Sequence, residues 1–521
     1  MELTSIDIII FLSFLVAVVG VGFWVGRKQE ATVDEYFLAG NRIPWFAIGF
    51  SIIAASISTE QFLGEVGFAY RYGLAVANWE WANFIAQLVL AFIFIPVFLR
   101  LRILTIPEYL ACRYDDRCRT LFAILLVLSY AFINLAGVLY LGGFAIEVLF
   151  GFDKWSAIWV LAAIAGAYTI YGGLTSVVWT DLLNGGILLG GGVLVFVLGV
   201  LAVPGGMSEI LGSGDRAHLM LPASHPELPW TAILALAFCT NIFYYCTNQY
   251  INQRCLASRT QWDARMGVIF ASFLGLPLAL AVTFPGMIGY ALNPSLEVAD
   301  QAYPYVVSRL VPAGLRGVVF AALTGAVLST IASLVSSSAS IITINLYQRF
   351  VNASASDRQM IRVGRYSGLA ILLVGALWTP VVQRFELVFA YFQECWVFFS
   401  APIAVVFLAG ILWKRATASA AFYTLLLGFP MLALVFVRRE LFPQVNAFNI
   451  AGLAALGMLA FLVVHSRLFG RKEVRPSDLP CWHPELLNLP PTDKHHRWTT
   501  SERTWAMVLI LAYVILYASL W

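Results

Sequence analysis

Charged residues are scarce in this sequence. Asp, Glu, Lys and Arg together make up 12% of the 521 residues, whereas 60% of the residues are hydrophobic and the mean hydropathy is +0.81. A soluble domain of this composition would expose far too much apolar surface to water. The composition therefore excludes a soluble protein and predicts an all-α polytopic membrane protein whose main surroundings are the lipid bilayer.

The sequence also lacks the marks of several other kinds of site. None of its seven cysteines pairs with another at a ligand-like CxxC spacing, so we expect reduced thiols and no disulfide or metal site. The net charge is only +3, and no stretch combines basic and aromatic residues into a platform for nucleic acid. We therefore expect no nucleic-acid partner, and no feature indicates an obligatory protein partner.

The sequence contains many long hydrophobic runs. A bilayer core about 30 Å thick is crossed by about 20 helical residues. About fourteen segments reach that length: 6–26, 44–70, 75–99, 120–150, 154–172, 181–203, 229–253, 266–292, 316–348, 364–382, 386–412, 417–437, 447–466 and 503–521. The polar stretch at about 467–503, rich in Pro and His, is interpreted as a solvated cytoplasmic linker.

The positions of Lys and Arg predict the orientation of these segments. If both termini lie outside, about three quarters of the 32 basic residues fall in cytoplasmic loops, as the positive-inside rule requires. The basic residues next to the first segment, Arg27 and Lys28, follow it, which is typical of a retained helix rather than a cleaved leader. We expect a multi-pass protein of the cell (inner or plasma) membrane with both termini extracytoplasmic.

Two membrane segments are interrupted by polar residues. Ser51–Gly67 contains Glu60 and Gln61, and a carboxylate at bilayer depth costs at least about 2.5 kcal/mol unless it faces protein or water. Ala237–Gln253, five segments later, has a similar polar break. Paired interrupted segments indicate an inverted-repeat transporter with its site between the halves. The alternative is that one of them is a continuous helix with polar packing residues.

Glu80 lies between two tryptophans in the run ANWEW. A carboxylate accepts hydrogen bonds from adjacent sugar hydroxyls, and an indole ring stacks on the apolar face of a sugar. This pattern favours a sugar-binding residue. The alternative is a carboxylate satisfied by its helix neighbours.

The segment Thr324–Ser340 is rich in Gly, Ala, Ser and Thr. Adjacent hydroxyls at Ser329 and Thr330, beside a broken helix with free carbonyls, would form an oxygen-only site suited to a hard cation such as sodium. Equally, Ser and Thr in membrane helices bond back to their own carbonyls or pack across interfaces. The pattern alone leaves both interpretations open.

Several motifs occur together over residues 36–415, in the order YFLAGNRIPWFAIGFSIIAASISTEQFLG, GLAVANWEW, VLYLGG, IYGGLTSVVWTD, NQYINQR, FAALTGAVLSTIASLVSSSAS and FLAGILWKR. They resemble the sodium/solute symporter family, and within it most the sodium–sugar (glucose/galactose) cotransporter branch. The resemblance implies a LeuT-like core of two inverted five-helix repeats with discontinuous helices. The implied division is an extra helix and loop (1–43), a first repeat (44–203), a second repeat with its preceding extracellular loop (204–412), and three C-terminal helices (413–521).

The resemblance also implies roles for individual residues. The sodium site falls on the carbonyls of Ala54, Ile57 and Ala326 and the hydroxyls of Ser329 and Thr330, with Asp181 on the sodium exit path. The substrate-binding positions are Gln61, Glu80, Asn241 and Gln393, and the gates are Tyr244, Trp79 and Phe389. Sodium is the implied coupling ion and a sugar or polyol the implied substrate.

Three positions depart from the sodium–sugar branch. Gly275 stands where the branch has a sugar-contacting lysine, Ser56 replaces the asparagine that braces the inner tyrosine, and Glu65 occupies an outer-lid position that is usually apolar. The sequence thus predicts a transporter, not an enzyme, that imports a sugar or polyol, most readily a hexose, with sodium by alternating access. Other solutes (inositol, a sugar acid, an amino acid), proton coupling and a non-transporting sugar sensor stay open.

Overall fold

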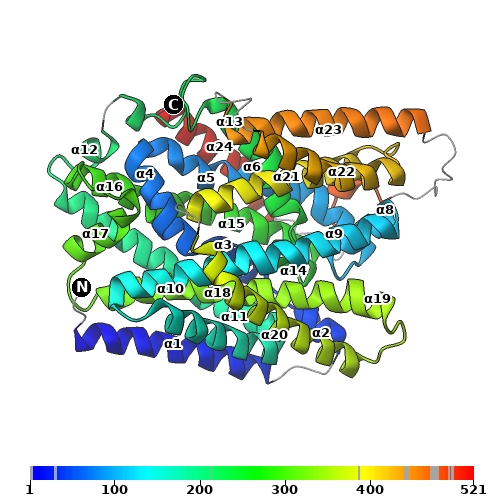
Figure 1. Ribbon diagram of the computed structural model, residues 1–521, viewed down its shortest axis with the longest axis horizontal. Helices are drawn as coiled ribbons and strands as arrows, with labels where there is room; N and C mark the ends of the chain where they lie inside the picture. The colour runs from blue at the N-terminus through cyan, green and yellow to red at the C-terminus, as the bar shows by residue number, and fades with distance from the viewer. Residues whose placement is uncertain are drawn as a thin grey trace.

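The computed structural model is built from helices that run side by side along the horizontal direction of Figure 1. It describes residues 4–27, 32–212, 214–384, 388–438, 445–469, 480–490, 493 and 498–521. Over these ranges no strand forms, and the only β-type pairings are two isolated bridges, Ile43–Ser258 and Leu221–Pro229. The predicted all-α class is therefore confirmed.

The first part of the chain, up to residue 202, alternates α-helices with short 3₁₀- and π-helical turns. Its elements are α1 (Ser5–Gly26), α2 (Val33–Leu38), η1 (Ala39–Asn41), α3 (Trp45–Ser56), η2 (Glu60–Glu65), α4 (Val66–Tyr72), η3 (Gly73–Ala77), α5 (Asn78–Trp81), α6 (Asn83–Val89), η4 (Leu90–Phe94), α7 (Ile95–Leu101), α8 (Ile106–Arg113), α9 (Asp116–Ser129), η5 (Tyr130–Leu135), α10 (Ala136–Phe150) and α11 (Lys154–Ala202).

The remainder follows the same pattern. Its elements are α12 (Met207–Leu211), η6 (Gly214–Ala217), α13 (Trp230–Ala235), η7 (Leu236–Thr240), η8 (Ile242–Thr247), α14 (Gln249–Leu256), α15 (Gln261–Val282), α16 (Phe284–Leu292), η9 (Ala299–Gln301), α17 (Ala302–Leu310), α18 (Arg316–Ile341), η10 (Ile342–Tyr347), α19 (Gln348–Phe350), α20 (Asp357–Val382), α21 (Val388–Leu412), α22 (Ala418–Val437), α23 (Ala447–Phe469), η13 (Pro484–Leu487), η15 (Trp498–Thr500) and α24 (Glu502–Leu520).

Twelve continuous helical stretches in the described ranges are long and apolar enough to cross a membrane. Two of them extend over parts of two predicted segments: Glu60–Leu101, with 42 residues, joins the end of 44–70 to 75–99, and Lys154–Ala202, with 49, joins 154–172 to 181–203. The second would be about 74 Å long if straight, more than twice the bilayer core. It turns at Gly173, which has φ 53° and whose added Cβ would lie 2.3 Å from the backbone oxygen of Tyr36. The predicted count of about fourteen is thus approximate, and the multi-pass architecture is confirmed.

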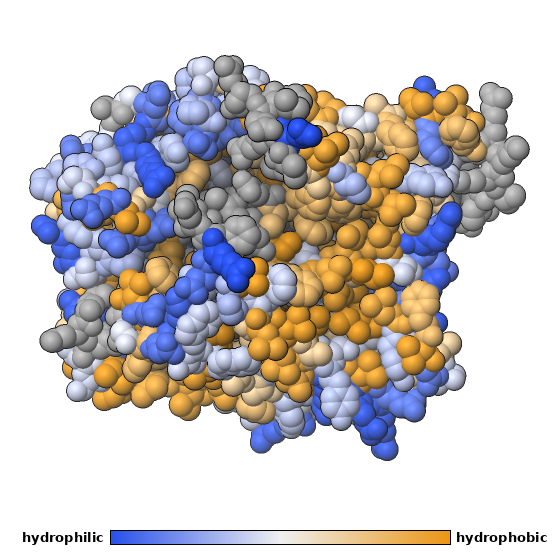
Figure 2. Space-filling model, viewed as in Figure 1, coloured by the Kyte–Doolittle hydropathy of each residue, from blue (hydrophilic) through white to orange (hydrophobic). Residues whose placement is uncertain are grey.

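Burial separates the central helices from the peripheral ones. The most apolar stretch of the α18 span is 94% buried, whereas that of α1 is 11% buried, so α18 forms the centre and α1 faces the bilayer. Hydrophobic side chains gather across the middle of the molecule in Figure 2, and hydrophilic ones gather at its left and lower right edges. This distribution is the one expected of a protein that crosses a bilayer along the horizontal direction of the view.

The chain ends are tied to loops on one side of the bundle. The Asp7 carboxylate accepts the backbone N–H groups of Gly314 and Gly317 at 2.9 and 2.8 Å. At the other terminus, the Leu219 N–H donates to the Leu520 carbonyl at 2.8 Å. Both termini lie toward the left of Figure 1, near α12, α16 and α17, whereas α8 and α19 lie at the right.

Part of the stretch interpreted as a solvated linker packs onto the membrane domain instead. The Trp482 indole N–H donates to the Phe92 carbonyl at 2.9 Å, and its backbone N–H donates to the Ile411 carbonyl at 2.8 Å. Cys481 beside it is buried. The solvated interpretation was therefore wrong for Cys481 and Trp482, which pack on the membrane domain, whereas Pro484, Glu485, Asn488 and Pro490 are exposed.

Two helices are interrupted where the sequence predicted polar breaks. The helix α3 ends at Ser56, Ile57 is extended with φ −108° and ψ 127°, and helical structure resumes before η2. In the second segment Asn248 is extended with φ −72° and ψ 132° between η8 and α14. Both predicted discontinuities are confirmed, and they face the central helix α18.

Candidate functional site

The break after α3 releases two backbone carbonyls. In a continuous helix the Ser58 N–H would bond the Ala54 carbonyl, but here it donates to Gln61 Oε1 at 2.8 Å. The Gln61 N–H, which would bond the Ile57 carbonyl, donates instead to Ser58 O at 3.2 Å. The carbonyls of Ala54 and Ile57 thus lose their helix partners at a buried position, which membrane proteins tolerate where the backbone lines a binding site.

A hydroxyl of α18 meets this break. Thr330 Oγ1 lies 3.3 Å from the Ile57 carbonyl oxygen and 3.1 Å from the Ala326 carbonyl oxygen. Three of the five predicted sodium ligands are therefore side by side, and all of them are uncharged oxygens. That donor set fits a hard monovalent cation. Ser329 Oγ points to the other side of α18, where it donates to Asp181 Oδ1.

Asp181 and Arg254 form an ion pair inside the protein. Their side chains are fully buried, and Arg254 Nη2 lies 2.9 Å from Asp181 Oδ2. The same guanidinium donates to the hydroxyls of Ser51 and Ser333, each at 2.5 Å, and Ser51 Oγ also donates to Asp181 Oδ2 at 2.5 Å. One charge network therefore links α3, α11, α14 and α18 directly behind the oxygens of the break.

Sequence reasoning missed the role of Arg254. The predicted membrane segment ended at residue 253, so Arg254 and Arg265 were both assigned to a cytoplasmic loop. In the structure both side chains are 0% exposed, and Arg265 Nη1 lies 3.4 Å from Glu502 Oε1. In the sequence, the polar run NQYINQR was the only sign that Arg254 could lie inside the protein. In the structure the polar residues that precede Arg254 are also buried.

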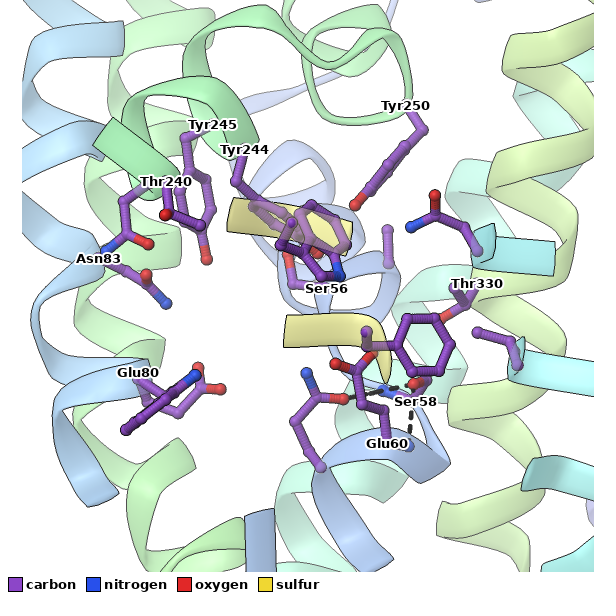
Figure 3. Close-up of a pocket in the computed structure, with 18 of the residues that line it drawn as sticks. Ser56, Ser58, Glu60, Glu80, Asn83, Thr240, Tyr244, Tyr245, Tyr250 and Thr330 are labelled. Carbon is purple, nitrogen blue, oxygen red and sulfur yellow. Dashed lines mark hydrogen bonds between the residues drawn. The ribbon is translucent and has the colours of Figure 1, made fainter. Parts of the chain in front are cut away.

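A cavity opens from the same break. The space in which the centre of a water-sized molecule fits is about 80 Å³, and the empty space with the open side included is about 730 Å³. All five of the predicted substrate and gate residues whose side chains are described line it: Gln61, Trp79, Glu80, Asn241 and Tyr244. In Figure 3, Glu80 and Asn83 lie on one side of the cavity, Glu60 and Thr330 on the other, and Tyr244 and Tyr245 between them.

The polar lining presents groups without protein partners. The side chain of Asn241 is 5% exposed, and no hydrogen bond in the described structure reaches its Nδ2. A buried donor of this kind costs about 1–3 kcal/mol unless a bound molecule accepts its hydrogen bond. Glu60 and Glu80 are 8% and 7% exposed and line the same space. The cavity is thus suited to a ligand rich in hydroxyl groups.

Aromatic side chains close the cavity on two sides. The Tyr244 ring packs against Trp396, with ring centroids 4.7 Å apart, and against Tyr250 at 5.8 Å. The Trp79 ring packs against Phe448 at 5.7 Å and Phe68 at 6.0 Å. The predicted inner and outer gate positions therefore belong to separate aromatic clusters.

Several lining residues had no assigned role in the sequence. They are Asn134, Thr240, Tyr245, Tyr250 and Trp396. They come from η5, η7, η8, α14 and α21, which only the tertiary fold brings together. Gln393 and Phe389 lie on α21, but their side chains are outside the described part of the structure.

One of the three positions that depart from the sodium–sugar branch, Ser56, belongs to the cavity lining, whereas Gly275 and Glu65 do not. The Ser56 hydroxyl donates to the Ile52 carbonyl at 2.7 Å. A Cβ added at Gly275 would lie 3.2 Å from the Tyr513 hydroxyl and 4.0 Å from the Glu80 backbone oxygen. Glu65 is 1% exposed and accepts a hydrogen bond from Thr283 Oγ1 at 2.7 Å.

Comparison with known proteins agrees with this geometry. The chain matches the Sodium:solute symporter family over residues 36–428. It is 35% identical over 459 residues to the Sodium/glucose cotransporter of Vibrio parahaemolyticus, covering 82% of this chain and 84% of that protein. It is 33% identical over 473 residues to the Sodium/myo-inositol cotransporter 2 of Oryctolagus cuniculus, covering 83% of this chain and 69% of that protein.

Two solved structures show the fold. A substrate-bound outward-open Na⁺-coupled sialic acid symporter superposes with a TM-score of 0.76 at 24% identity, over 90% of this chain and 99% of that one. The nucleobase-cation-symport-1 family transporter Mhp1, in a closed conformation with bromovinylhydantoin bound, superposes with a TM-score of 0.54 at 17% identity. The match covers 83% of this chain and 95% of that one. These likenesses confirm the predicted LeuT-like core. Because the family match covers most of the chain, this protein belongs to the sodium:solute symporter family, a sodium-coupled membrane transporter and not an enzyme, as its motifs predicted.

Proposed function

We propose that the protein imports a sugar or sugar-like polyol together with sodium by alternating access. The single observation that carries the proposal is the contact of Thr330 Oγ1 with the Ile57 carbonyl oxygen, 3.3 Å away, at the break between α3 and η2. The same break presents Ser58 and Gln61 to the cavity. Occupancy of the oxygen site is thereby coupled to the shape of the cavity.

The substrate class rests on the lining chemistry and on the relatives. Glu80, Asn241 and Gln61 supply hydrogen-bond acceptors and donors, and Trp79 supplies an aromatic face. Two relatives are named for glucose and for myo-inositol, which are both rings with adjacent hydroxyl groups. Gln393 and Phe389 keep the binding and gating roles that the sequence implies.

The transport cycle follows from these positions. A sodium ion held by Ala54, Ile57, Ala326, Ser329 and Thr330 joins the broken segment to α18 and holds the cavity in its binding shape. Closure of the Trp79 side and movement of Tyr244 then release the substrate inward, and Asp181 receives sodium on its way out. The proposed orientation places both termini outside, and the proposed repeats cover 44–203 and 204–412.

One sodium ion is sufficient for accumulation. One charge that moves across about 100 mV contributes about 2.3 kcal/mol. A tenfold sodium gradient adds about 1.4 kcal/mol. Together these terms support a substrate ratio of about 500-fold.

The proposal is tested by uptake into proteoliposomes. Radiolabelled glucose, galactose and myo-inositol are each presented with an inward sodium gradient, with choline in place of sodium, and with choline at acidic pH. We expect accumulation of at least one of the three with sodium only. Equal accumulation in acidic choline would indicate proton coupling, and no sodium-dependent accumulation of any of them would contradict the proposed substrate class.

A further inference from the structure

A hydrophobic groove runs between the helices α22 and α23. The two helices lie next to each other at the upper right of Figure 1, and the backbone N–H of Thr417, just before α22, donates to Ser466 Oγ, near the end of α23, at 3.2 Å. The space in which the centre of a water-sized molecule fits is about 570 Å³ in this groove, compared with about 80 Å³ in the substrate cavity. The groove is the roomier of the two, and no part of the transport site uses it.

The walls of the groove are hydrocarbon. Apart from Tyr423 and Thr424, every described side chain that lines it is apolar, and the Thr424 hydroxyl is already bonded to a carbonyl of its own helix. Leu427, Leu453 and Phe461 of the lining are exposed, so the groove opens outward from the helix bundle. In a pair of membrane-spanning helices such a surface faces lipid. The groove therefore accepts an apolar chain and offers little to a polar solute.

The groove has the length of a lipid chain in one leaflet. It follows α22 from Tyr423 to Val435, which at about 1.5 Å per residue is about 18 Å. One leaflet of the hydrocarbon core is about 15 Å deep, half of the whole thickness of about 30 Å. Midway along, Gly428, Ala454 and Gly457 have little or no side chain to fill the space. One acyl chain that runs from a membrane surface to the midplane therefore fits along the groove.

Basic residues gather at the end of the groove where Tyr423 lies. Lys414 and Arg415 precede α22, Arg467 lies in the last turn of α23, and the hydrogen bond between the two helices joins these positions. Lys414 and Arg467 are exposed and form no ion pair in the described part of the chain. At the opposite end, Arg438 is a described basic residue in the turn after α22. Because basic residues next to a membrane surface attract anionic lipids, the Lys414 end is suited to a negatively charged headgroup.

We propose that the groove between α22 and α23 is a binding site for an anionic phospholipid. One acyl chain lies along the groove, and the phosphate group lies next to Lys414 and Arg467. The apolar walls hold the chain, and the two basic residues select the headgroup. The site uses neither the substrate cavity nor the sodium site, so it can be tested without transport.

The test is native mass spectrometry of the full chain released from detergent. Dioleoyl phosphatidylglycerol, which is anionic, is compared with dioleoyl phosphatidylcholine, which has the same acyl chains and no net charge. Gly457→Leu fills the groove without a clash, because a Cβ added there meets no atom within 4 Å. Gly20→Leu on the peripheral helix α1 is its matched control, since an added Cβ there also meets no atom within 4 Å.

A second set of variants tests the headgroup. Lys414→Gln with Arg467→Gln removes the two positive charges at the proposed phosphate position. Arg358→Gln with Arg362→Gln is the matched control, because these two arginines are also exposed and lie on α20, away from the groove. Arg438→Gln tests the opposite end. Monodispersity in detergent and the thermal unfolding temperature verify the fold of each variant.

We expect the parent and Gly20→Leu to retain one phosphatidylglycerol more tightly than phosphatidylcholine, and Gly457→Leu to lose this lipid. Each basic residue near a membrane surface contributes about fivefold to the attraction of an anionic lipid, so Lys414→Gln with Arg467→Gln should lower the affinity for phosphatidylglycerol by about 25-fold. Its affinity for phosphatidylcholine should not change.

Equal affinities of the parent for the two lipids, or a lipid that stays bound in Gly457→Leu, would overturn the proposal. A preference for phosphatidylglycerol that is lost in Arg438→Gln or in the control double variant, but not in Lys414→Gln with Arg467→Gln, would also overturn it. A parent dimer that Gly457→Leu separates into single chains would assign the groove to a second copy of the chain in place of a lipid.

Discussion

Arg254 and Asp181 neutralise each other where no water reaches either side chain. Their Nη2 and Oδ2 atoms are 2.9 Å apart, and both side chains are 0% exposed. Ser329, whose neighbour Thr330 contacts the broken helix, donates to the same carboxylate. The charge of Asp181 is therefore shared between a guanidinium and a hydroxyl next to the proposed sodium site. A change in this pair is expected to affect both stability and sodium binding.

Removal of one partner should destabilise the protein more than removal of both. Arg254→Gln leaves the Asp181 carboxylate buried without its counter-charge, at a cost of about 3–5 kcal/mol in the free energy of unfolding. The double variant Asp181→Asn with Arg254→Gln leaves no uncompensated charge and should recover much of that loss. Thermal unfolding in detergent, read by intrinsic fluorescence, compares Arg254→Gln, Asp181→Asn and the double variant. Additive effects of the two single substitutions would contradict the pairing.

Thr330 should determine the sodium concentration needed for transport. Thr330→Ala removes a hydroxyl that contacts the Ile57 and Ala326 carbonyls, so the sodium concentration for half-maximal uptake should rise at least about tenfold, which corresponds to about 1.4 kcal/mol. Thr330→Ser keeps the hydroxyl and should keep sodium affinity near that of the parent. The matched control is Thr343→Ala. Thr343 lies in η10, which continues directly from α18, and the described structure shows no partner for its hydroxyl. An unchanged sodium dependence in Thr330→Ala would remove Thr330 from the site.

The helix breaks and much of the cavity could be predicted from the sequence because polar residues are conspicuous in a hydrophobic run. Glu60, Gln61 and Asn241 stand out in this way, and all three line the cavity. The contact of Thr330 with Ile57 also follows the prediction, although Ser329 turns toward Asp181.

The remaining features depend on contacts that no local pattern contains. Arg254 follows the end of a hydrophobic segment, where basic residues normally mark a loop, and its burial depends on Asp181, 73 residues earlier in the chain. Hydropathy reports how apolar a segment is, but not which buried charges will meet.

Gln61 should prove to have two separable roles. Its Oε1 accepts the Ser58 N–H at 2.8 Å and so holds the helix break open, while its amide nitrogen is left for substrate. Gln61→Met removes both functions, and the unpaired Ser58 N–H costs about 1–3 kcal/mol, so the half-saturating concentrations of sodium and of substrate should both rise. Gln61→Glu keeps the acceptor but loses the donor, so only the substrate value should rise. Sodium and substrate titrations of uptake distinguish the two patterns, and a parallel change in both variants would refute the division of roles.

Two serines provide a matched test of membrane orientation. Ser295, in the loop after α16, and Ser354, in the loop after α19, are both exposed, and each bonds the asparagine two positions before it, Asn293 and Asn352 respectively. With both termini outside, Ser295 faces the exterior and Ser354 the cytoplasm. In a background in which the exposed Cys112 is replaced by serine, a membrane-impermeant maleimide added to intact cells should label Ser295→Cys and not Ser354→Cys. Permeabilised cells should label both, because the two turns expose their side chains to a similar degree. Labelling of Ser354→Cys alone in intact cells would reverse the proposed topology, and the inward direction of transport with it.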